Sequence, residues 1–307
     1  MAIEYNNQTE IEALSSQNRD TSRYLSDQRV SMFGSARLSE IAARLGGGRI
    51  GEAMASYIAD CTSALTTSIY PRERRRNFHL TDDYLLQKIK SMSGLVGYWP
   101  LNEVTSGSAR DYSGNGNHGT TTTALVAQSG QSGRAYTFGG ASTDQVVTGY
   151  STHNQQVSYV ALVYKTGNGG GNLGRVFDKR VSGAQSEVMF WSTASTLEYN
   201  RQFSGGNAIW NVTDVAGLNA WQMIGLTYNS SSATNDPIFY INGVARSLAG
   251  DTNSTGTVSD NADAYVIGNR ASDSLRNFAG KMQHFAIFNR ILTATEMLNL
   301  AQIAGVA

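Results

Sequence analysis

The chain has 307 residues, 40% of them apolar and 16% charged, and its formal net charge is zero at pH 7. This balance excludes the basic surface typical of proteins that bind nucleic acid or anionic membranes. No apolar run reaches the roughly 20 residues of a membrane helix, and the start lacks a basic stretch followed by an apolar one, so we expect neither membrane insertion nor a signal peptide.

Residues 1–93 predict helices, because only 5 of the 32 glycines lie there. Thr9 and Glu12 have the spacing of a capping box, and a second helix is expected from about Ser35 to the glycines at 46–48. The strongest helical pattern covers about residues 50–69, and a short helix follows Thr81. The single cysteine lies in the strongest pattern, so no internal disulfide is possible and a reducing cytoplasm is the expected place of synthesis.

The helix over 50–69 has an apolar stripe only one residue wide. Its members are Ile50, Met54, Tyr57, Cys61, Leu65 and Ile69. A stripe this narrow is typical of a helix whose partner lies on another chain, so we expect a trimer or docking to another protein. The alternative is a helical hairpin packed on the rest of the same chain. The cluster Arg72–Arg76 could contact an acidic partner or nucleic acid, and the alternative, which we favour, is a solvated linker.

From Gly94 onward the apolar residues recur with period two, which predicts strands. The clearest are Val157–Tyr164, Glu187–Trp191, Trp221–Tyr228, Ile238–Ile241 and Phe285–Phe288. Asn-Gly and Gly-Gly turn signals separate them, and a capping box at Thr293 and Glu296 predicts one closing helix. About a dozen strands without helices between them favour two packed antiparallel sheets, so we place a β-sandwich domain at 94–307 and expect it to fold alone.

Five blocks of this region resemble laminin-G-like, concanavalin A-like domains. They are Gly97–Glu103, Asp111–Gly119, Gly133–Gly140, Trp221–Gly243 and Phe278–Thr293. The resemblance implies a mainly β fold, a jelly-roll sandwich preceded by a helical segment. It does not fix the function, because domains of this kind bind sugars, proteins or calcium, or only space other parts.

The loop from Asp111 to Asn117 is a candidate calcium site. Glycines at 114 and 116 allow a tight turn, so Asp111, Asn115 and Asn117 could present oxygen ligands to a hard cation. In many relatives an acidic pair on the last strand supports this region, but the matching positions here are Gln283 and His284. A metal-free turn held by side-chain hydrogen bonds is the alternative, and we expect calcium binding to be weak or absent.

Catalytic patterns are missing from the sequence. Glucanases of this fold carry carboxylates that alternate along one strand, and no predicted strand has that spacing. The four histidines, at positions 79, 118, 153 and 284, have no metal-ligand spacing. We therefore expect no enzyme and no cofactor.

A glycan platform is the more plausible site, because sugar rings stack on aromatic side chains. Trp191, Tyr199 and Trp210 are the candidates, with Arg201 and Asn207 beside them. The alternative is that Trp191 and Trp210 are core residues of the inner sheet faces. The remaining tryptophans, Trp99 and Trp221, lie in the family blocks and are expected in the core.

A helical N-terminus ahead of a lectin-like sandwich, without a signal peptide, fits a virion protein made in a host cytoplasm. We interpret the chain as a phage head fibre, capsid decoration or tail-fibre subunit. Residues 1–93 would form a trimer and dock to the capsid, and the sandwich would bind host surface glycans. The alternative is a cellular carbohydrate-binding or adhesion module, and a glucanase-type enzyme comes third.

Overall fold

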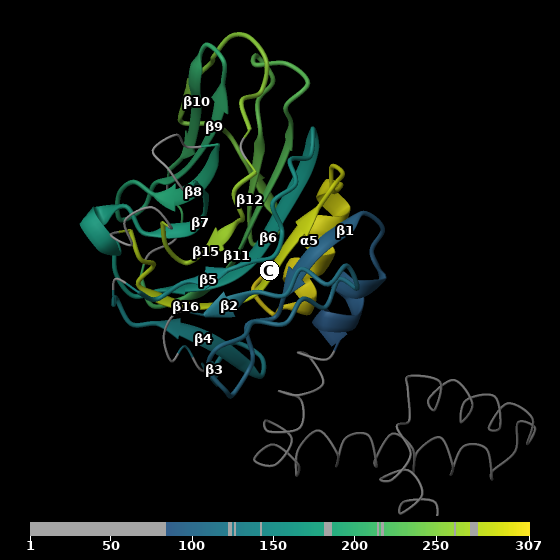
Figure 1. Cartoon of the computed structure of the whole chain (residues 1–307), viewed down its shortest axis with the longest axis vertical. Helices are drawn as coiled ribbons and strands as arrows, with labels where there is room; N and C mark the ends of the chain where they lie inside the picture. The colour runs from purple at the N-terminus through teal and green to yellow at the C-terminus, as the bar shows by residue number, and fades with distance from the viewer. Residues whose placement is uncertain are drawn as a thin grey trace, which may run out of the picture. The chain divides into compact units, whose positions relative to one another are not determined.

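The computed structural model describes residues 84–307, except for 122–124, 126, 142, 181–185, 214, 216–217, 261 and 271–275. The described residues form a sandwich of two eight-stranded antiparallel sheets (Figure 1). This confirms the expected mainly β fold. The helices expected before residue 81, the cluster Arg72–Arg76 and His79 lie outside the described residues.

The first sheet places strands from distant parts of the sequence side by side. Its order is β13 (Val244–Arg246), β12 (Ile238–Ile241), β11 (Trp221–Asn229), β6 (Gln156–Lys165), β16 (Gly280–Phe288), β4 (Arg134–Phe138) and β3 (Ala127–Ser129), and β1 (Leu95–Trp99) also pairs with β16. All of the clearest predicted strands are confirmed, four of them in this sheet. The predicted Asn-Gly turn joins β12 to β13, with positive φ at both Asn242 and Gly243.

The second sheet holds the strands that carry most of the buried charged side chains. Its order is β14 (Gly250–Thr252), β10 (Gly206–Val212), β9 (Leu197–Phe203), β8 (Glu187–Trp191), β7 (Arg175–Lys179), β15 (Val266–Ile267), β5 (Val146–Val147) and β2 (Thr120–Thr121). A short 3₁₀ turn, η1 (Gly170–Asn172), precedes β7.

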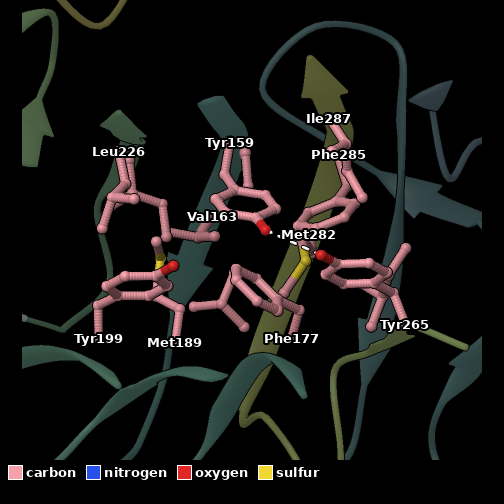
Figure 2. Packing of buried hydrophobic residues seen from close by; sticks show 14 of the residues in the cluster. Tyr159, Val163, Phe177, Met189, Tyr199, Leu226, Tyr265, Met282, Phe285 and Ile287 are labelled. Carbon is pink, nitrogen blue, oxygen red and sulfur yellow. Dashed lines mark hydrogen bonds between the residues drawn. The ribbon is translucent and has the colours of Figure 1, made fainter. Parts of the chain in front are cut away.

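The main apolar core lies between the two sheets (Figure 2). Strand β6 shows how it is built, since Tyr159 and Val163 point into this core while Leu162 belongs to a second apolar cluster on the other face. A strand buried on both faces has to be apolar along its length, which explains the continuous apolar sequence of β6. Phe177 and Met189, from the second sheet, close the core opposite β6.

The second apolar cluster covers the outer face of the first sheet. Helix α5 (Ala294–Ile303) contributes Met297 and Leu300, and its N-terminus is held by the predicted capping box of Thr293 and Glu296. Residues 84–91 are also helical, and Leu85 and Ile89 are buried in the same cluster as strand residues. Because this helical stretch packs on the sheet, we propose that the sandwich domain begins before residue 84 rather than at residue 94.

Strand β16 contains a β-bulge next to the residues that match the family's acidic pair. The pairing register with β6 shifts between Gln283 and Ala286, and His284 has a φ of 55°. The bulge sends the His284 ring toward Tyr98, whose hydroxyl lies 2.6 Å from Nδ1. Gln283 is also buried, and its side chain bonds the backbone of Gln131 and Ser132. Both residues therefore serve the packing of the first sheet.

Candidate functional site

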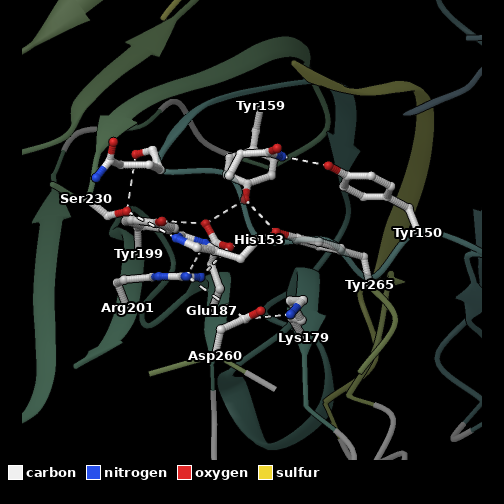
Figure 3. A network of polar contacts seen from close by, with 12 residues as sticks. Tyr150, His153, Tyr159, Lys179, Glu187, Tyr199, Arg201, Ser230, Asp260 and Tyr265 are labelled. Atoms are coloured by element: carbon white, nitrogen blue, oxygen red, sulfur yellow. Dashed lines mark hydrogen bonds and ion pairs between the residues drawn. The ribbon is translucent and has the colours of Figure 1, made fainter. Parts of the chain in front are cut away.

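A densely connected polar group of the sandwich surrounds Glu187, at the start of β8 (Figure 3). Its side chain points into the interior and is about 1% exposed. Oε1 accepts hydrogen bonds from the hydroxyls of Tyr159 and Tyr199, both at 2.5 Å. Oε2 accepts from Tyr265, at 2.8 Å, and from Nη1 of Arg201, at 2.8 Å. Four donors thus converge on one carboxylate, and one of them, Tyr159, comes from the opposite sheet.

The surroundings of Glu187 keep it ionised. Burial alone would raise the pKa of this carboxyl, but the guanidinium of Arg201 and the three tyrosine hydroxyls outweigh burial and hold it below its ordinary value. Burial and the carboxylate together raise the pKa of Tyr159 well above its ordinary range, so the phenol stays protonated. Each oxygen of Glu187 already accepts two hydrogen bonds. The carboxylate therefore has no acceptor position left for a substrate or a proton.

From Glu187 the polar group extends outward to the loops. Arg201 donates from Nη2 to Nδ1 of His153, so the neutral ring accepts there. Burial and Arg201 both lower the pKa of His153. On the other side Lys179 bonds Asp260, at 2.5 Å, and the Asp260 side chain is 25% exposed. Sequence reasoning missed this group, because its members are spread over more than 100 residues and meet only when the sheets pack.

The rings proposed from the sequence as a glycan platform are interior. Trp191, Tyr199 and Trp210 are each at most 1% exposed and belong to the core between the sheets. Tyr199 stacks on Trp210 with ring centroids 5.9 Å apart. A buried ring offers no face to a sugar, so these three residues do not form the expected platform. The alternative stated for the two tryptophans, that they are core residues, is what the structure shows.

The two polar residues of that predicted platform also lie elsewhere. Arg201 is buried and bound to Glu187, so it serves the interior polar group. Asn207 is exposed near the start of β10, opposite Gln202 on β9. The three rings with which it was expected to form a platform, those of Trp191, Tyr199 and Trp210, are buried.

A different aromatic pair is partly exposed. Tyr164 on β6 lies directly opposite Trp221 on β11, with ring centroids 5.5 Å apart. Both side chains are on the outer face of the first sheet, because the neighbouring residue Val163 points into the core. Trp99, by contrast, is fully buried, as expected. The expectation that Trp221 is a core residue was wrong: Trp221 is only partly buried, at the margin of the outer cluster.

The loop of residues 111–117 is held by its own side chains. Asp111 Oδ1 accepts from the backbone N–H of Tyr98, at 2.9 Å, and of Ser113, at 2.8 Å. Oδ2 accepts from the Ser113 hydroxyl and the Asn117 N–H, both at 2.8 Å. The amides of Asn115 and Asn117 donate to backbone carbonyls of β1, such as that of Val96. These bonds use the carboxylate that a calcium ion would need, which favours the metal-free turn.

We therefore predict that calcium changes the stability only slightly. A cation that binds the native state alone at a hundred times its dissociation constant would stabilise it by roughly 2.7 kcal/mol. The difference between millimolar calcium and a chelator, measured by thermal melting, is expected to be clearly smaller. Asp111→Ala should lower the melting temperature equally with and without calcium, because it leaves backbone N–H groups without acceptors. A full-sized calcium shift abolished by Asp111→Ala would contradict this.

The predicted oligomerisation residues lie outside the described part of the chain. They are Ile50, Met54, Tyr57, Leu65 and Ile69. Within the described residues, no three or more His, Cys, Asp or Glu side chains are grouped so as to hold a metal ion. In the same part of the chain, no helix is long and apolar enough to cross a membrane.

The sandwich is similar to known proteins in part of its sequence and in its fold. Residues 168–297 match the family model described as the concanavalin A-like lectin/glucanases superfamily. The fold is similar to the binding domain of Paraclostridial mosquitocidal protein 1, at 14% identity and a TM-score of 0.51, covering 69% of this chain and 52% of that one. It is also similar to the ligand-binding domain of botulinum neurotoxin serotype D in complex with N-acetylneuraminic acid, at 14% identity and a TM-score of 0.53, covering 71% and 52%. This chain spans about half of those two chains, and no curated protein matches it.

Proposed function

We propose that this concanavalin A-like sandwich is a non-enzymatic, lectin-type domain that binds carbohydrate through Tyr164 and Trp221. The observation that carries the proposal is the position of this pair: two aromatic rings from neighbouring strands, in contact and partly exposed on an outer sheet face. Two adjacent rings offer a sugar the apolar surface on which its C–H face stacks.

Polar groups surround the two rings and can bond sugar hydroxyls. Lys281, on β16, lies opposite Tyr164 on β6, and its ammonium donates to the Ser129 carbonyl at 2.9 Å. Asn219 is exposed two residues before Trp221, and its backbone is anchored by a 2.7 Å bond to Lys165. A few polar groups around an apolar surface are typical of a carbohydrate site.

Two further points support binding rather than catalysis. The carboxylate at the centre of the interior polar group, that of Glu187, has its acceptor positions filled by protein donors, which leaves it unsuited to acid–base catalysis. The neurotoxin domain with a similar fold was solved with N-acetylneuraminic acid, a sugar.

Trp221→Ala is expected to weaken glycan binding by at least about 2 kcal/mol, roughly thirty-fold, because it removes the larger ring of the pair. A glycan array with the intact protein identifies a binding sugar, and calorimetric titration compares the variants. The matched control is Tyr112→Ala, which removes another partly exposed ring that packs on the outer cluster. If the Trp221 variant binds as tightly as the control, the platform lies elsewhere. If no glycan binds the intact protein, the proposed function fails.

We also propose that residues 1–93 anchor the protein to a phage particle as a trimer, so that the sandwich faces host surface glycans. The support is the sequence alone: a narrow apolar stripe on the expected helix over residues 50–69. Three copies around an axis would bury that stripe completely, at roughly 1.5–3 kcal/mol for each large apolar side chain.

Leu65→Asp is therefore expected to convert the trimer to a monomer without unfolding the sandwich, because it places three carboxylates in one apolar seam. Light scattering at micromolar concentration measures the mass, and circular dichroism checks the strands. Ser56→Asp, a change of equal charge beside the stripe, should leave the trimer intact. A monomeric full-length protein would contradict the trimer and leave docking to a capsid protein as the remaining use of the stripe.

A further inference from the structure

A row of three partly exposed side chains crosses the outer face of the first sheet. The pairing register places Trp221 on β11 opposite Tyr164 on β6, and Tyr164 opposite Lys281 on β16. Opposite residues on adjacent strands point to the same face, and adjacent strands lie about 4.8 Å apart. The two rings and the lysine therefore stand in line across three neighbouring strands.

The row has a direction. It ends at Trp221, because β12 stops at Ile241, which is opposite Ile224 rather than Trp221. A sugar chain stacked on the rings thus has a further strand beneath it only toward β16. Lys281 is the next side chain that such a chain meets in this direction.

The ammonium of Lys281 is available to a ligand. Its one hydrogen bond among the described residues is to the carbonyl of Ser129 on β3, at 2.9 Å. An ammonium has three donors, so two remain, and Lys281 forms no ion pair with a described carboxylate. The strand β4 lies between β16 and β3, so the bond to Ser129 directs the side chain away from Tyr164. A single sugar stacked on the rings therefore does not reach the charge, whereas a chain of sugars does.

The strands of the first sheet carry only positive charge. Their eight segments contain four basic residues and no Asp or Glu; the four are Arg134, Lys165, Arg246 and Lys281. The helical residues 84–91, which pack on the outer face of this sheet, add two lysines and no carboxylate. The strands of the second sheet, in contrast, carry both signs. The charge beside the two rings therefore favours an anionic ligand.

We propose that the ligand is a linear acidic oligosaccharide that crosses the strands of the first sheet. Its neutral face stacks on Tyr164 and Trp221, and an anionic substituent further along the chain, a carboxylate or a sulfate ester, binds the ammonium of Lys281. Bonds between an ammonium and either anion are charge-assisted and shorter than neutral ones. The inference rests on the proposed function, because it names the class of sugar that the same two rings bind.

The first experiment compares acidic and neutral chains of equal length. Calorimetric titration of the intact protein uses trigalacturonate and its uncharged methyl ester. A second pair, a galactose trisaccharide with and without sulfate esters, distinguishes a carboxylate from a sulfate. The wild type should bind the acidic member of at least one pair about fivefold more tightly. Added salt should reduce this preference, since the contact is exposed.

Variants then locate the charge that gives the preference. Lys281→Gln should abolish it, and Lys281→Arg should keep it, because arginine retains the positive charge. The matched control is Arg246→Gln, which removes one positive charge from an exposed position on β13 of the same sheet and should keep the preference. Trp221→Ala should weaken both members of a pair alike. If Arg246→Gln removes the preference as fully as Lys281→Gln, the ligand responds to the charge of the whole sheet and the contact with Lys281 is wrong.

The remaining outcomes separate this inference from the proposed function. If the wild type binds both members of each pair equally, or if only neutral glycans of an array bind, the acidic ligand is wrong and the proposed function stands. If no glycan binds at all, the proposed function itself fails. Galacturonate monomer should bind the wild type and Lys281→Gln equally. A loss of monomer binding in Lys281→Gln would show that one sugar reaches both the rings and the charge, so that no chain is required.

Discussion

Glu187→Ala is expected to lower the free energy of unfolding by about 3–5 kcal/mol, because it leaves the buried guanidinium of Arg201 without its carboxylate. The same change removes the acceptor of three buried tyrosine hydroxyls, those of Tyr159, Tyr199 and Tyr265. Urea unfolding followed by tryptophan fluorescence measures the effect, since all of the described tryptophans lie in the sandwich.

A double variant separates the charge from the packing. Glu187→Met together with Arg201→Met removes both ions and keeps most of the volume, so it should be less destabilising than the sum of the two single changes. Glu198→Ala is the control, because Glu198 is a carboxylate on the same sheet that is only partly buried. It should cost about 1 kcal/mol or less. A loss of under about 1 kcal/mol for Glu187→Ala would show that the interior polar group contributes little.

Removing residues 1–92 is expected to destabilise the sandwich by on the order of 5 kcal/mol relative to a chain that starts at Arg74. The truncation deletes Leu85, Ile89 and Met92, which are buried in the outer cluster, and each large apolar side chain contributes roughly 1.5–3 kcal/mol. Tyr98 and Phe288, on the first sheet, belong to the same cluster. We therefore propose, against the expectation from the sequence, that a chain starting near residue 93 is much less stable than one that keeps these residues.

Thermal melting and circular dichroism compare the stability of the chain that starts at Arg74 with that of the chain that lacks residues 1–92. A Leu85→Ser/Ile89→Ser variant of the longer chain should lose stability in the same way, because it removes the apolar contacts and keeps the helix. Tyr84→Ser is the control, since that side chain is 58% exposed. Equal melting of the two chains would mean that the helical residues 84–91 lie on the sheet without stabilising it.

The sequence predicted the strands well because their signal is local. The apolar, strand-forming residues of β6 and β11, the Asn242-Gly243 turn and the capping box at Thr293 are each recognised from a few neighbouring residues. The resemblance to the family then supplied the arrangement of two sheets, which no local pattern contains.

The residues of the candidate functional site were predicted poorly from the sequence, for a physical reason. Whether a tryptophan on a strand is buried depends on which sheet face is covered, and that is decided by residues distant in the sequence. Trp191 is buried and Trp221 partly exposed, although both stand in apolar strands. The polar group around Glu187 was missed for the same reason, since Tyr159 and Tyr265 are 106 residues apart and meet only in the folded chain.

The donors around Glu187 come from both sheets, and this has a mechanical consequence. Apolar side chains at a sheet interface tolerate small sliding movements, because dispersion contacts have little directionality. The short bond from Tyr159 on β6 to Glu187 on β8 tolerates none, since hydrogen bonds weaken steeply with distance and angle. A pulling force that shears one sheet along the other must therefore break this bond early. The Glu187 carboxylate thus links the two layers by a directional bond, and it adds resistance to shear near the start of β8.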